Sequence, residues 1–280
     1  MERLEAHRSF FANLVTATVG IPGRDSRLTA AFASTPRERF VGDGPWRVFT
    51  AAGYIETPSD DPAFLYQDIT VALKSEGSIN NGQPTLHAAC LASLNPRDGE
   101  AVVHIGAGAG YYTALLAKLV GPTGSVAAYE IEPDLAERAA ENLADLPQVT
   151  VQHRSGSEGS LPDCDVMYVN AGATGPLDTW LDALRPGGGR LLFPLTPAEG
   201  AGGMLLITRT RPDSYDARFV CRALFIPCAG ARDEETAKKL SEAFRRDDLK
   251  DVKSLRRHTA PDETAWCSGP GWWLSKERVK

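Results

Sequence analysis

The sequence predicts an α/β protein built around a doubly wound, mainly parallel β-sheet. Three observations lead to this fold class. From residue 101 onward, short β-rich runs alternate with helical stretches, the order that produces a parallel sheet with right-handed crossovers. A turn of small residues joins the first of these runs to the first of these helices. The composition, with 42% apolar and 24% charged residues in 280, is ordinary for a soluble globular protein with a buried core.

The alternating elements can be placed from their residue types. The strand candidates are rich in apolar and β-branched residues, and they cover residues 101–105, 125–130, 149–153, 166–169 and 190–193. The helix candidates cover residues 111–120, 133–146 and 176–184. The last two open with Pro133 and Pro176, and proline is favourable in the first turn of a helix. Ligands of such sheets bind at the carboxyl ends of the strands.

Before this region we expect a helical cap followed by a loop. Apolar residues recur at helical spacing up to about residue 52, which predicts helices there. Residues 52–84 are rich in Gly, Pro, Ser and Asp, so we predict mostly loop. Within it, residues 78–85 form an irregular connection that we expect to be functional, because long loops inside compact domains usually are.

The segment after Gly203 is predicted to add two strands and one helix. Residues 204–208 and 219–226 read as an antiparallel pair on the sheet edge, and residues 234–246 as a charged amphipathic helix on the surface. Trp266, Trp272 and Trp273 then lie in the tail. Large aromatic residues of this kind mostly anchor a segment against the core. The alternative is that their turn covers a substrate cleft.

Charge and cysteine content exclude several classes of protein. The formal net charge of -6 disfavours a partner such as nucleic acid or an anionic membrane, because both require a basic face. No apolar run has the length of a membrane span. The five cysteines are widely spaced, which favours reduced thiols over a disulfide framework and gives no support for a metal site. We therefore expect a cytoplasmic protein.

The small-residue turn carries the strongest functional signal. Gly106, Gly108 and Gly110 follow the first strand, and Glu130 ends the next one. Glycine lets the backbone turn tightly and approach a ligand, while an acidic residue at the second strand end accepts hydrogen bonds from ribose hydroxyls. The last glycine of the dinucleotide pattern is missing, since Tyr111 follows Gly110 directly. This spacing favours S-adenosylmethionine over NAD, because a pyrophosphate requires an open helix N-terminus.

Several motifs, in consistent order, resemble the protein-L-isoaspartate O-methyltransferase family. Residues 35–41, T-P-R-E-R-F-V, are similar to its P-R-E-x-F-V signature, and Tyr66-Gln67-Asp68 resembles its Y-x-D. Residues 103–112 follow its first cofactor motif. Residues 165–170, 184–191 and 193–194 resemble its later strands, and Phe225-Ile226-Pro227 its closing F-V-P. The resemblance covers residues 35–230 and leaves the tail outside it.

Three positions depart from the family pattern. His104 stands where the family has a glutamate that helps to anchor the methionine end of the cofactor. Ser155 stands where the family has an aspartate near the adenine amino group. Gly82 stands two positions before Pro84, where the family's substrate loop has a hydroxyl side chain. We therefore expect cofactor binding to be retained and the acceptor loop to be altered.

The resemblance implies a class I methyltransferase with a Rossmann-like, seven-stranded sheet. It implies a helical and substrate-loop cap in residues 1–85, an S-adenosylmethionine-binding core in residues 86–230, and a helical, Trp-rich extension in residues 231–280. The cofactor-binding candidates lie at strand ends and turns: His104, Gly106, Ala107, Gly108, Gly110, Tyr111, Glu130, Ile131, Ser155, Gly156 and Asn170. The candidates for the catalytic and acceptor site are Asn80, Asn81, Gly82, Gln83 and His87.

The implied reaction is methyl transfer to a carboxylate of a protein or peptide, at an isoaspartyl, aspartyl or C-terminal position. A carboxylate is ionised at neutral pH and requires no general base. A hydroxyl acceptor would require one, and His87 and His104 are the candidates. One alternative is a small-molecule or natural-product O- or N-methyltransferase on the same scaffold. Another is a protein that binds S-adenosylmethionine or S-adenosylhomocysteine without turnover.

Overall fold

The computed structural model describes residues 2–17, 26–74, 79–246 and 248–279. Ser78, the first residue of the predicted functional loop, lies outside them, as does part of the predicted N-terminal helical region. The chain divides into two compact units: Met1–Gly99 with Ala107–Arg154, and Glu100–Gly106 with Ser155–Lys280. Among the described residues, no helix combines the length and apolar content needed to cross a membrane.

Four helices of the first unit pack together, and one of them is largely buried. They are α1 (Glu2–Ala17), α2 (Ser26–Ser34), α3 (Pro84–Leu94) and α4 (Tyr111–Val120). In α4, Lys118 alone is exposed, since its other residues contact neighbouring elements. Phe32 of α2 packs edge-to-face on Tyr111 of α4, with ring centroids 6.4 Å apart. Edge-to-face aromatic packing of this kind stabilises a core beyond the area it buries.

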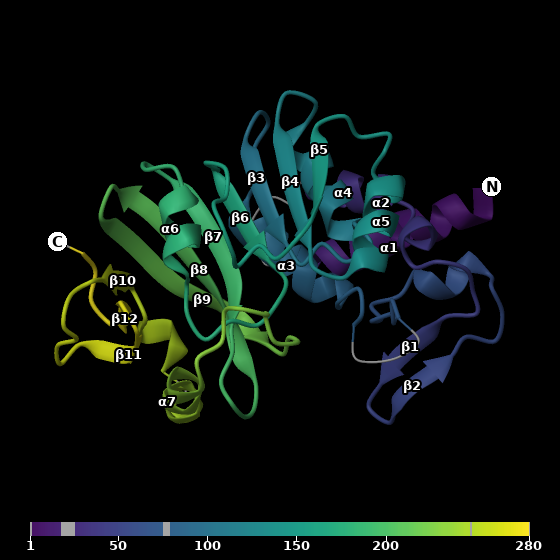
Figure 1. The fold of residues 1–280 in the computed structure, drawn as a ribbon. Helices are drawn as coiled ribbons and strands as arrows, with labels where there is room; N and C mark the ends of the chain where they lie inside the picture. Colours follow the sequence, from purple (N-terminus) through teal and green to yellow (C-terminus); the bar gives the residue numbers. More distant parts are fainter. Residues whose placement is uncertain (1, 18–25, 75–78, 247, 280) are drawn as a thin grey trace. The chain divides into compact units, whose positions relative to one another are not determined.

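A β-hairpin occupies part of the segment predicted to be helical. The 3₁₀ helix η1 (Arg37–Phe40) is followed by β1 (Arg47–Thr50) and β2 (Gly53–Glu56), which pair antiparallel (Figure 1). The helical prediction up to residue 52 is therefore wrong from Val41 onward. In β1, Val48 is buried between exposed neighbours, the period-2 pattern of a strand. Of the predicted loop, the residues that the structure describes are otherwise irregular apart from β2, η2 (Pro62–Leu65) and the first residue of the helix that begins at Pro84.

The first unit also holds two parallel strands and a helix beside them. They are β4 (Ser125–Glu130) and β5 (Val149–His153), with α5 (Pro133–Asn142) packed on β5. Both strands match the prediction, and Pro133 lies in the first turn of α5. The helix ends four residues earlier than predicted, because Pro147 follows a turn in which Leu146 N donates to Leu143 O. Proline disfavours helical geometry in the residue before it.

The second unit contains a sheet with the order β11-β12-β10-β9-β8-β7-β6-β3. Strands β3 (Ala101–Ile105), β6 (Val166–Val169) and β7 (Gly189–Leu195) run parallel, as predicted. Antiparallel pairing begins between β7 and β8 (Gly202–Arg211) and continues with β9 (Ser214–Ala223). These strands lie side by side in Figure 1. Helix α6 (Asp178–Ala183) packs on the sheet through Trp180, whose ring contacts Phe193 of β7.

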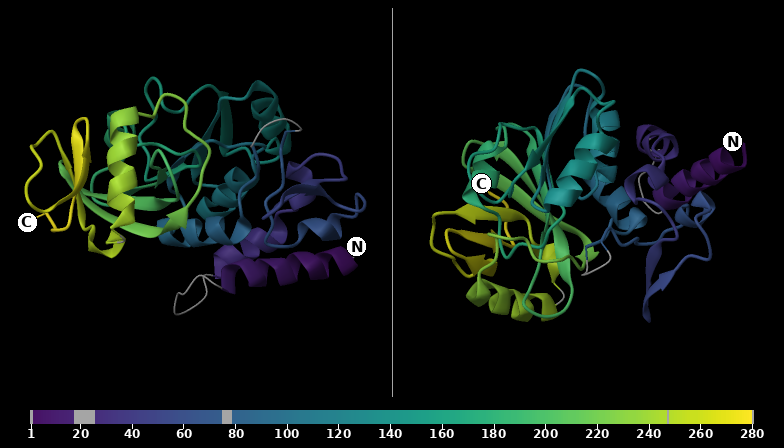
Figure 2. Two further views of the ribbon diagram at one scale, coloured as in Figure 1. Left: turned by 90° about the horizontal axis from the view of Figure 1, so that it is seen from below. Right: turned by 45° about the vertical axis from the view of Figure 1, so that its right-hand side comes forward.

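The C-terminal segment continues this sheet. From the sequence, β8 and β9 were predicted to form the edge of the sheet, followed by a helical extension. That placement is wrong, because β10 (Ser254–Arg257) pairs with β9, and β12 (Trp272–Ser275) and β11 (Ala265–Gly269) follow. The predicted helix is present as α7 (Glu234–Arg245) and lies beside β11 in both views of Figure 2. Helix α6 begins at Asp178, so Pro176 lies before it rather than in its first turn.

The tail tryptophans are buried, in keeping with the anchor interpretation. Trp266, Trp272 and Trp273 are 2%, 6% and 4% exposed. Trp266 packs edge-to-face on Phe219 of β9 and Phe244 of α7, with both pairs of ring centroids 5.3 Å apart. Its Nε1 donates to Asp248 at 2.6 Å. Since a buried tryptophan removes a large apolar surface from water, these contacts attach the tail firmly to the second unit.

Candidate functional site

In the first unit, Glu130 is fixed against the glycine turn. It ends β4 and is 6% exposed. One carboxylate oxygen accepts from Gly108 N at 2.6 Å and the other accepts from Glu132 N at 3.0 Å. Burial raises the pKa of Glu130, while these backbone donors favour the ionised form. A carboxylate held in this way retains lone pairs for a further pair of hydroxyl donors.

The glycines of the turn are required by close packing and by backbone conformation. Gly106, Gly108 and Gly110 all have positive φ, at +76°, +56° and +95°. A Cβ at Gly110 would lie 2.8 Å from a methyl carbon of Leu143, and one at Gly108 would lie 3.1 Å from Leu73. Ala107 N donates to Tyr129 O at 3.1 Å, which ties the turn to β4. Residues with a side chain rarely adopt positive φ, so only glycine fits the backbone of this turn.

The two remaining candidates of the first unit lie in different environments. Tyr111 is 4% exposed, and its ring packs on Phe40 at a centroid distance of 5.5 Å. Burial raises the pKa of its phenol. Its side chain therefore belongs to the helical core, and its contribution to the turn is the start of α4. Ile131, directly after Glu130, is 49% exposed and offers an apolar surface beside the carboxylate.

In the second unit, His104 and Asn170 meet at the ends of adjacent parallel strands. Asn170 Nδ2 lies 2.8 Å from His104 Nε2, and Asn170 N donates to Ile105 O. His104 is fully buried and stacks on Tyr168 of β6. Burial lowers the pKa of His104 to about 3, so the imidazole is neutral. Asn170 Oδ1 is buried and has no hydrogen-bond partner among the described residues.

Ser155 and Gly156 form a turn that packs on β3. The Ser155 hydroxyl lies 2.7 Å from the Ser157 hydroxyl and accepts from Ser157 N at 3.2 Å. A Cβ at Gly156 would lie 2.6 Å from Ile105, so glycine is required there. The Gly156 carbonyl accepts from Trp180 Nε1 at 2.9 Å. The Ser155 side chain is therefore bonded within its own turn. It does not project towards a ligand as the family's aspartate would.

The predicted acceptor loop is built from hydrogen bonds between its amides and the backbone. Asn81 N donates to Val71 O, and Val71 N donates to Asn81 Oδ1 at 2.8 Å. Asn80 Oδ1 accepts from Gly82 N at 2.9 Å, which makes an Asx turn. Gln83 Nε2 donates to Asp68 Oδ2 at 2.8 Å. The structure therefore gathers Asn80, Asn81, Gly82 and Gln83 on one ordered loop, from residue 79 onward.

His87 fills the space beside Gly82. A Cβ at Gly82 would lie 2.1 Å from His87 Nε2, and the φ of Gly82 is +69°. The His87 ring is 2% exposed and stacks on Tyr112, with centroids 3.6 Å apart and an interplanar angle of 12°. The imidazole thus occupies the position from which a side chain at residue 82 would project.

Three residues that shape the acceptor loop were not predicted to have a structural role. The buried Arg37 guanidinium donates to the carbonyls of Leu65, Gln67 and Ile69. Glu38 accepts from the Tyr66 hydroxyl. Asp68, besides holding Gln83, accepts from Thr85 N at 2.8 Å. These residues lie within the P-R-E and Y-x-D motifs, so the signal was present in the sequence, but it did not reveal which backbone groups they hold.

Each of the two units therefore brings together its own set of predicted residues. The first unit brings Glu130 to Gly108, and separately orders the acceptor loop around His87. The second unit brings His104 to Asn170 and Ile105 to Gly156. An acidic residue at a strand end, held against a glycine turn, is the arrangement that binds the ribose of an adenosyl ligand.

Comparisons with known proteins agree with this arrangement. The family model described as protein-L-isoaspartate(D-aspartate) O-methyltransferase matches residues 20–233. The protein-L-isoaspartate O-methyltransferase of Brucella anthropi is 30% identical over 210 residues, which are 74% of this chain and 87% of that protein. That of Aeropyrum pernix is 32% identical over 211 residues, 73% of each chain.

Two solved structures share the fold. One, a protein-L-isoaspartate O-methyltransferase, has a TM-score of 0.66 and 22% identity, and covers 86% of this chain and 69% of its own. The other, from Plasmodium falciparum, was assigned to the same enzyme and contains S-adenosyl-L-homocysteine. Its TM-score is 0.63 at 16% identity, and it covers 80% of this chain and 98% of its own.

The fold, the glycine turn and the acidic strand end together define a class I S-adenosylmethionine-dependent methyltransferase. Within that class, the chain belongs to the protein-L-isoaspartate(D-aspartate) O-methyltransferase family.

Proposed function

We propose that this methyltransferase transfers a methyl group to a carboxylate of a protein or peptide, and that an isoaspartyl side chain is its main acceptor. The observation that carries the proposal is the acceptor loop. Residues 79–85 contain no titratable side chain, and the loop presents amides and backbone groups held in place by Asp68 and Asn80. Such a loop orients an acceptor that is already ionised, and it supplies no base.

The two histidines near the predicted site also favour a carboxylate acceptor. A general base works best with a pKa near the operating pH. Burial lowers the pKa of His104 to about 3, which makes it a poor base. The His87 ring is covered by Tyr112 on one face and is 2% exposed. A carboxylate acceptor removes the need for either group, because it is ionised at neutral pH.

For the cofactor, we propose separate roles in each unit. In the first unit, Glu130 accepts from the ribose hydroxyls, Ile131 covers one face of the adenine, and the backbone at Ala107, Gly108 and Gly110 lies against the ligand. Gly106, at the end of its segment of the second unit, contributes its backbone in the same way. In the second unit, Asn170 Oδ1 is an unused buried acceptor that suits the cofactor's amino group. Ser155 and Gly156 contribute backbone groups near the adenine.

The main role of these residues in the reaction is to position the reactants. S-adenosylmethionine supplies an electrophilic methyl group on a sulfonium. The chain holds the acceptor oxygen in line with it, and such positioning contributes on the order of 7–11 kcal/mol to lowering a barrier. We propose that residues 1–85 select the acceptor, residues 86–230 bind the cofactor, and residues 231–280 form an extension. Five free cysteines are in keeping with a reducing cytoplasmic setting.

The reaction can be tested with a matched pair of peptides, one with an isoaspartyl residue and one with ordinary aspartate. We expect radiolabelled methyl transfer from S-adenosylmethionine to the isoaspartyl peptide, and release of the label as methanol in mild base. Esters hydrolyse in base, whereas methyl ethers and methylamines do not. Label that is stable in base would reject a carboxylate acceptor.

A small-molecule acceptor is the second candidate, and one observation favours it. The His87 ring occupies the space beside Gly82, so the acceptor loop differs in shape from one with a hydroxyl side chain at that position. Methylation of neither peptide, in a protein that binds S-adenosylhomocysteine by calorimetry, would favour this candidate. Failure to bind S-adenosylhomocysteine at high micromolar concentration would contradict every cofactor-dependent function.

The role of Glu130 can be tested with Glu130→Gln. The amide has one acceptor oxygen in place of two and no charge, so we expect weaker ribose contacts. The dissociation constant of S-adenosylhomocysteine, measured by calorimetry, should rise about tenfold or more. Glu137→Gln, at an exposed position of α5, serves as the control. Unchanged affinity in the Glu130 variant would remove Glu130 from the cofactor site.

A further inference from the structure

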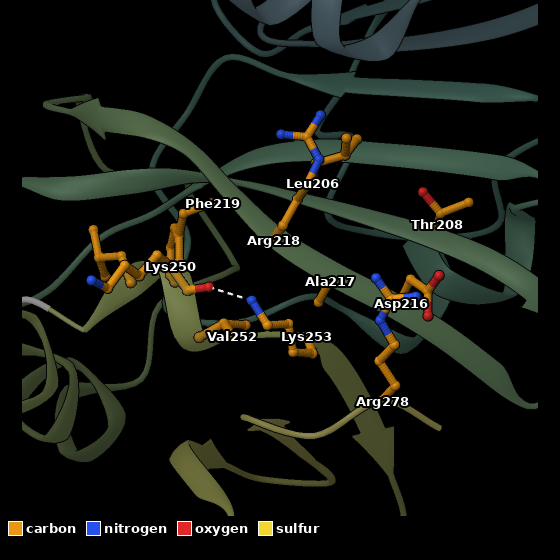
Figure 3. A pocket seen from close by; sticks show the side chains of 11 residues that line it. Leu206, Thr208, Asp216, Ala217, Arg218, Phe219, Lys250, Val252, Lys253 and Arg278 are labelled. Carbon is orange, nitrogen blue, oxygen red and sulfur yellow. Dashed lines mark hydrogen bonds between the residues drawn. The ribbon is translucent and has the colours of Figure 1, made fainter. Parts of the chain in front are cut away.

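The second unit has a hollow on one face of β8 and β9. Its volume is about 460 Å³. The pairing of the two strands sets Leu206 opposite Arg218 and Thr208 opposite Asp216. Paired residues of an antiparallel sheet point to the same face, so these four side chains share one face. The segment from Leu249 to Lys253 forms the adjoining wall (Figure 3).

The rim of this hollow is strongly basic. Four exposed cations line it, and Asp216 is its single carboxylate; the cations are Arg218, Lys250, Lys253 and Arg278. In the part of the chain that the structure describes, none of the four forms an ion pair. Lys253 Nζ instead donates to the Lys250 carbonyl at 2.5 Å. An excess of positive charge is notable in a chain with a formal net charge of -6.

The floor of the hollow is apolar. Leu206 and Val252 line it and are 6% and 1% exposed. Lys253 O accepts from Ala217 N at 2.9 Å, which holds the wall segment against β9. An occupant must therefore combine negative charge at the rim with aliphatic groups at the floor. Aspartate and glutamate side chains, with methylene stems and carboxylate ends, have this composition.

We propose that this hollow docks an acidic segment of the polypeptide acceptor; the inference rests on the proposed function. Carboxylates of the segment pair with the rim cations, and the stems cover the floor. Clusters of basic side chains commonly recognise acidic motifs in this way. A nucleic acid fits less well, because its sugar–phosphate backbone has no aliphatic stems to cover the apolar floor. The half-open hollow with exposed walls also suits a peptide better than a ligand that must be enclosed.

Binding can be measured separately from methylation. We would titrate a dye-labelled oligoglutamate peptide that lacks isoaspartate, and its oligoglutamine counterpart, into the full chain and follow fluorescence anisotropy. We expect only the glutamate peptide to bind, with an affinity that falls as salt is added. Arg218→Glu with Lys253→Glu should weaken binding about tenfold or more. Lys238→Glu, an exposed position of α7 outside the hollow, should leave it unchanged.

Methylation then shows whether docking serves the reaction. An isoaspartyl peptide with a glutamate tract should have a lower KM than one with a glutamine tract, and the double charge reversal should remove the difference while kcat stays the same. Docking without any methylation would uphold the hollow and contradict the proposed function. Equal binding of both labelled peptides, or equal loss in the Lys238 variant, would overturn the proposal. Tighter binding of single-stranded DNA of matched length would also overturn it, in favour of nucleic acid.

Discussion

At the scale of single residues, Gly82 is constrained both by its backbone and by its neighbour. Its φ is +69°, and a Cβ would lie 2.1 Å from His87 Nε2. The conformation disfavours any other residue, and the imidazole excludes the added carbon. Introducing a hydroxyl at this position therefore requires the His87 ring to move. Gly82 and His87 therefore shape the acceptor loop together.

We predict that Gly82→Ala lowers the free energy of unfolding by about 2 kcal/mol or more, from backbone strain and overlap together. Gly53→Ala is a matched control, because Gly53 also has positive φ but nothing lies within 4 Å of its Cβ position. Its cost should be nearer about 1 kcal/mol. In urea unfolding, the combination of Gly82→Ala with His87→Ala should cost less than the sum of the two changes. Full additivity would contradict the contact.

His104 makes stability depend on pH. Burial lowers its pKa to about 3 in the folded chain, whereas an unfolded chain has the ordinary value of 6.5. Below that value the unfolded state binds the additional proton, so stability is lost as pH falls towards the folded pKa. Between pH 6.5 and 5 the loss from this group is on the order of 1.5 kcal/mol.

We predict that His104→Gln removes this part of the pH dependence. Glutamine keeps a polar group that can bond Asn170, but it does not titrate. The difference in unfolding free energy between the wild type and the variant, measured by urea denaturation, should therefore shrink as pH falls from 6.5 to 5. His153→Gln, at an exposed strand end, is the control. Parallel pH profiles for wild type and His104→Gln would show that the imidazole is not held neutral.

At the scale of elements, Arg37 joins η1 to the segment that leads to the acceptor loop. Its guanidinium donates to three backbone carbonyls and lies over the Phe11 ring at 5.1 Å. The segment it holds contains Asp68, which in turn fixes Gln83 and the start of α3. The order of the acceptor loop is thus decided by an element that lies well before it in the sequence.

We predict that Arg37→Met destabilises the protein by about 3 kcal/mol or more, because one buried and two partly buried carbonyls lose their donor. Arg39→Met should cost less than about 1 kcal/mol, since Arg39 pairs with Asp145 on the surface. Thermal unfolding compares the two variants. At a temperature where both remain folded, Arg37→Met should raise the acceptor KM more than it changes the cofactor dissociation constant. Equal stability of the two variants would contradict the anchoring role.

At the scale of the whole molecule, the C-terminal segment adds strands to the sheet and is not a separate extension. Strand β10 pairs with β9 at Tyr215 and Asp216. Arg257 of β10 bonds Asp178 and Asp182 of α6, each at 2.7 Å. The tail therefore contacts both the sheet and a helix of the second unit, and it covers surface that would otherwise be exposed and apolar.

We predict that a chain ending at Arg246 is folded poorly or aggregates. It loses three buried tryptophans, each worth several kcal/mol of apolar burial, against a total stability of about 5–15 kcal/mol. Binding of an apolar dye and size-exclusion chromatography test this. A chain that lacks only residues 279–280 is the control. A soluble truncated chain with unchanged melting temperature would show that the tail is an independent appendage.

The sequence by itself determined the elements with local signals. The strands from Ala101 to Val169 and the helix α4 were placed to the residue, and α5 was predicted four residues too long, because period-2 and period-3.6 patterns are local and helix ends are not. The glycine turn and Glu130 were also recognisable, since spacing and strand order define them. The family motifs added the class of protein. Each of these depends on residues close together in the chain.

Tertiary structure decided the features that depend on distant partners. The strands β10, β11 and β12 were missed because a short strand is stabilised by the neighbour it pairs with, and β9 lies about thirty residues or more before β10. The hairpin β1–β2 replaced a predicted helix for the same reason: Arg47 O and Phe49 N bond Ala72 and Thr70. Burial keeps the His104 imidazole neutral. Packing in the interior places the His87 ring where a side chain at residue 82 would project. No local sequence pattern specifies either feature.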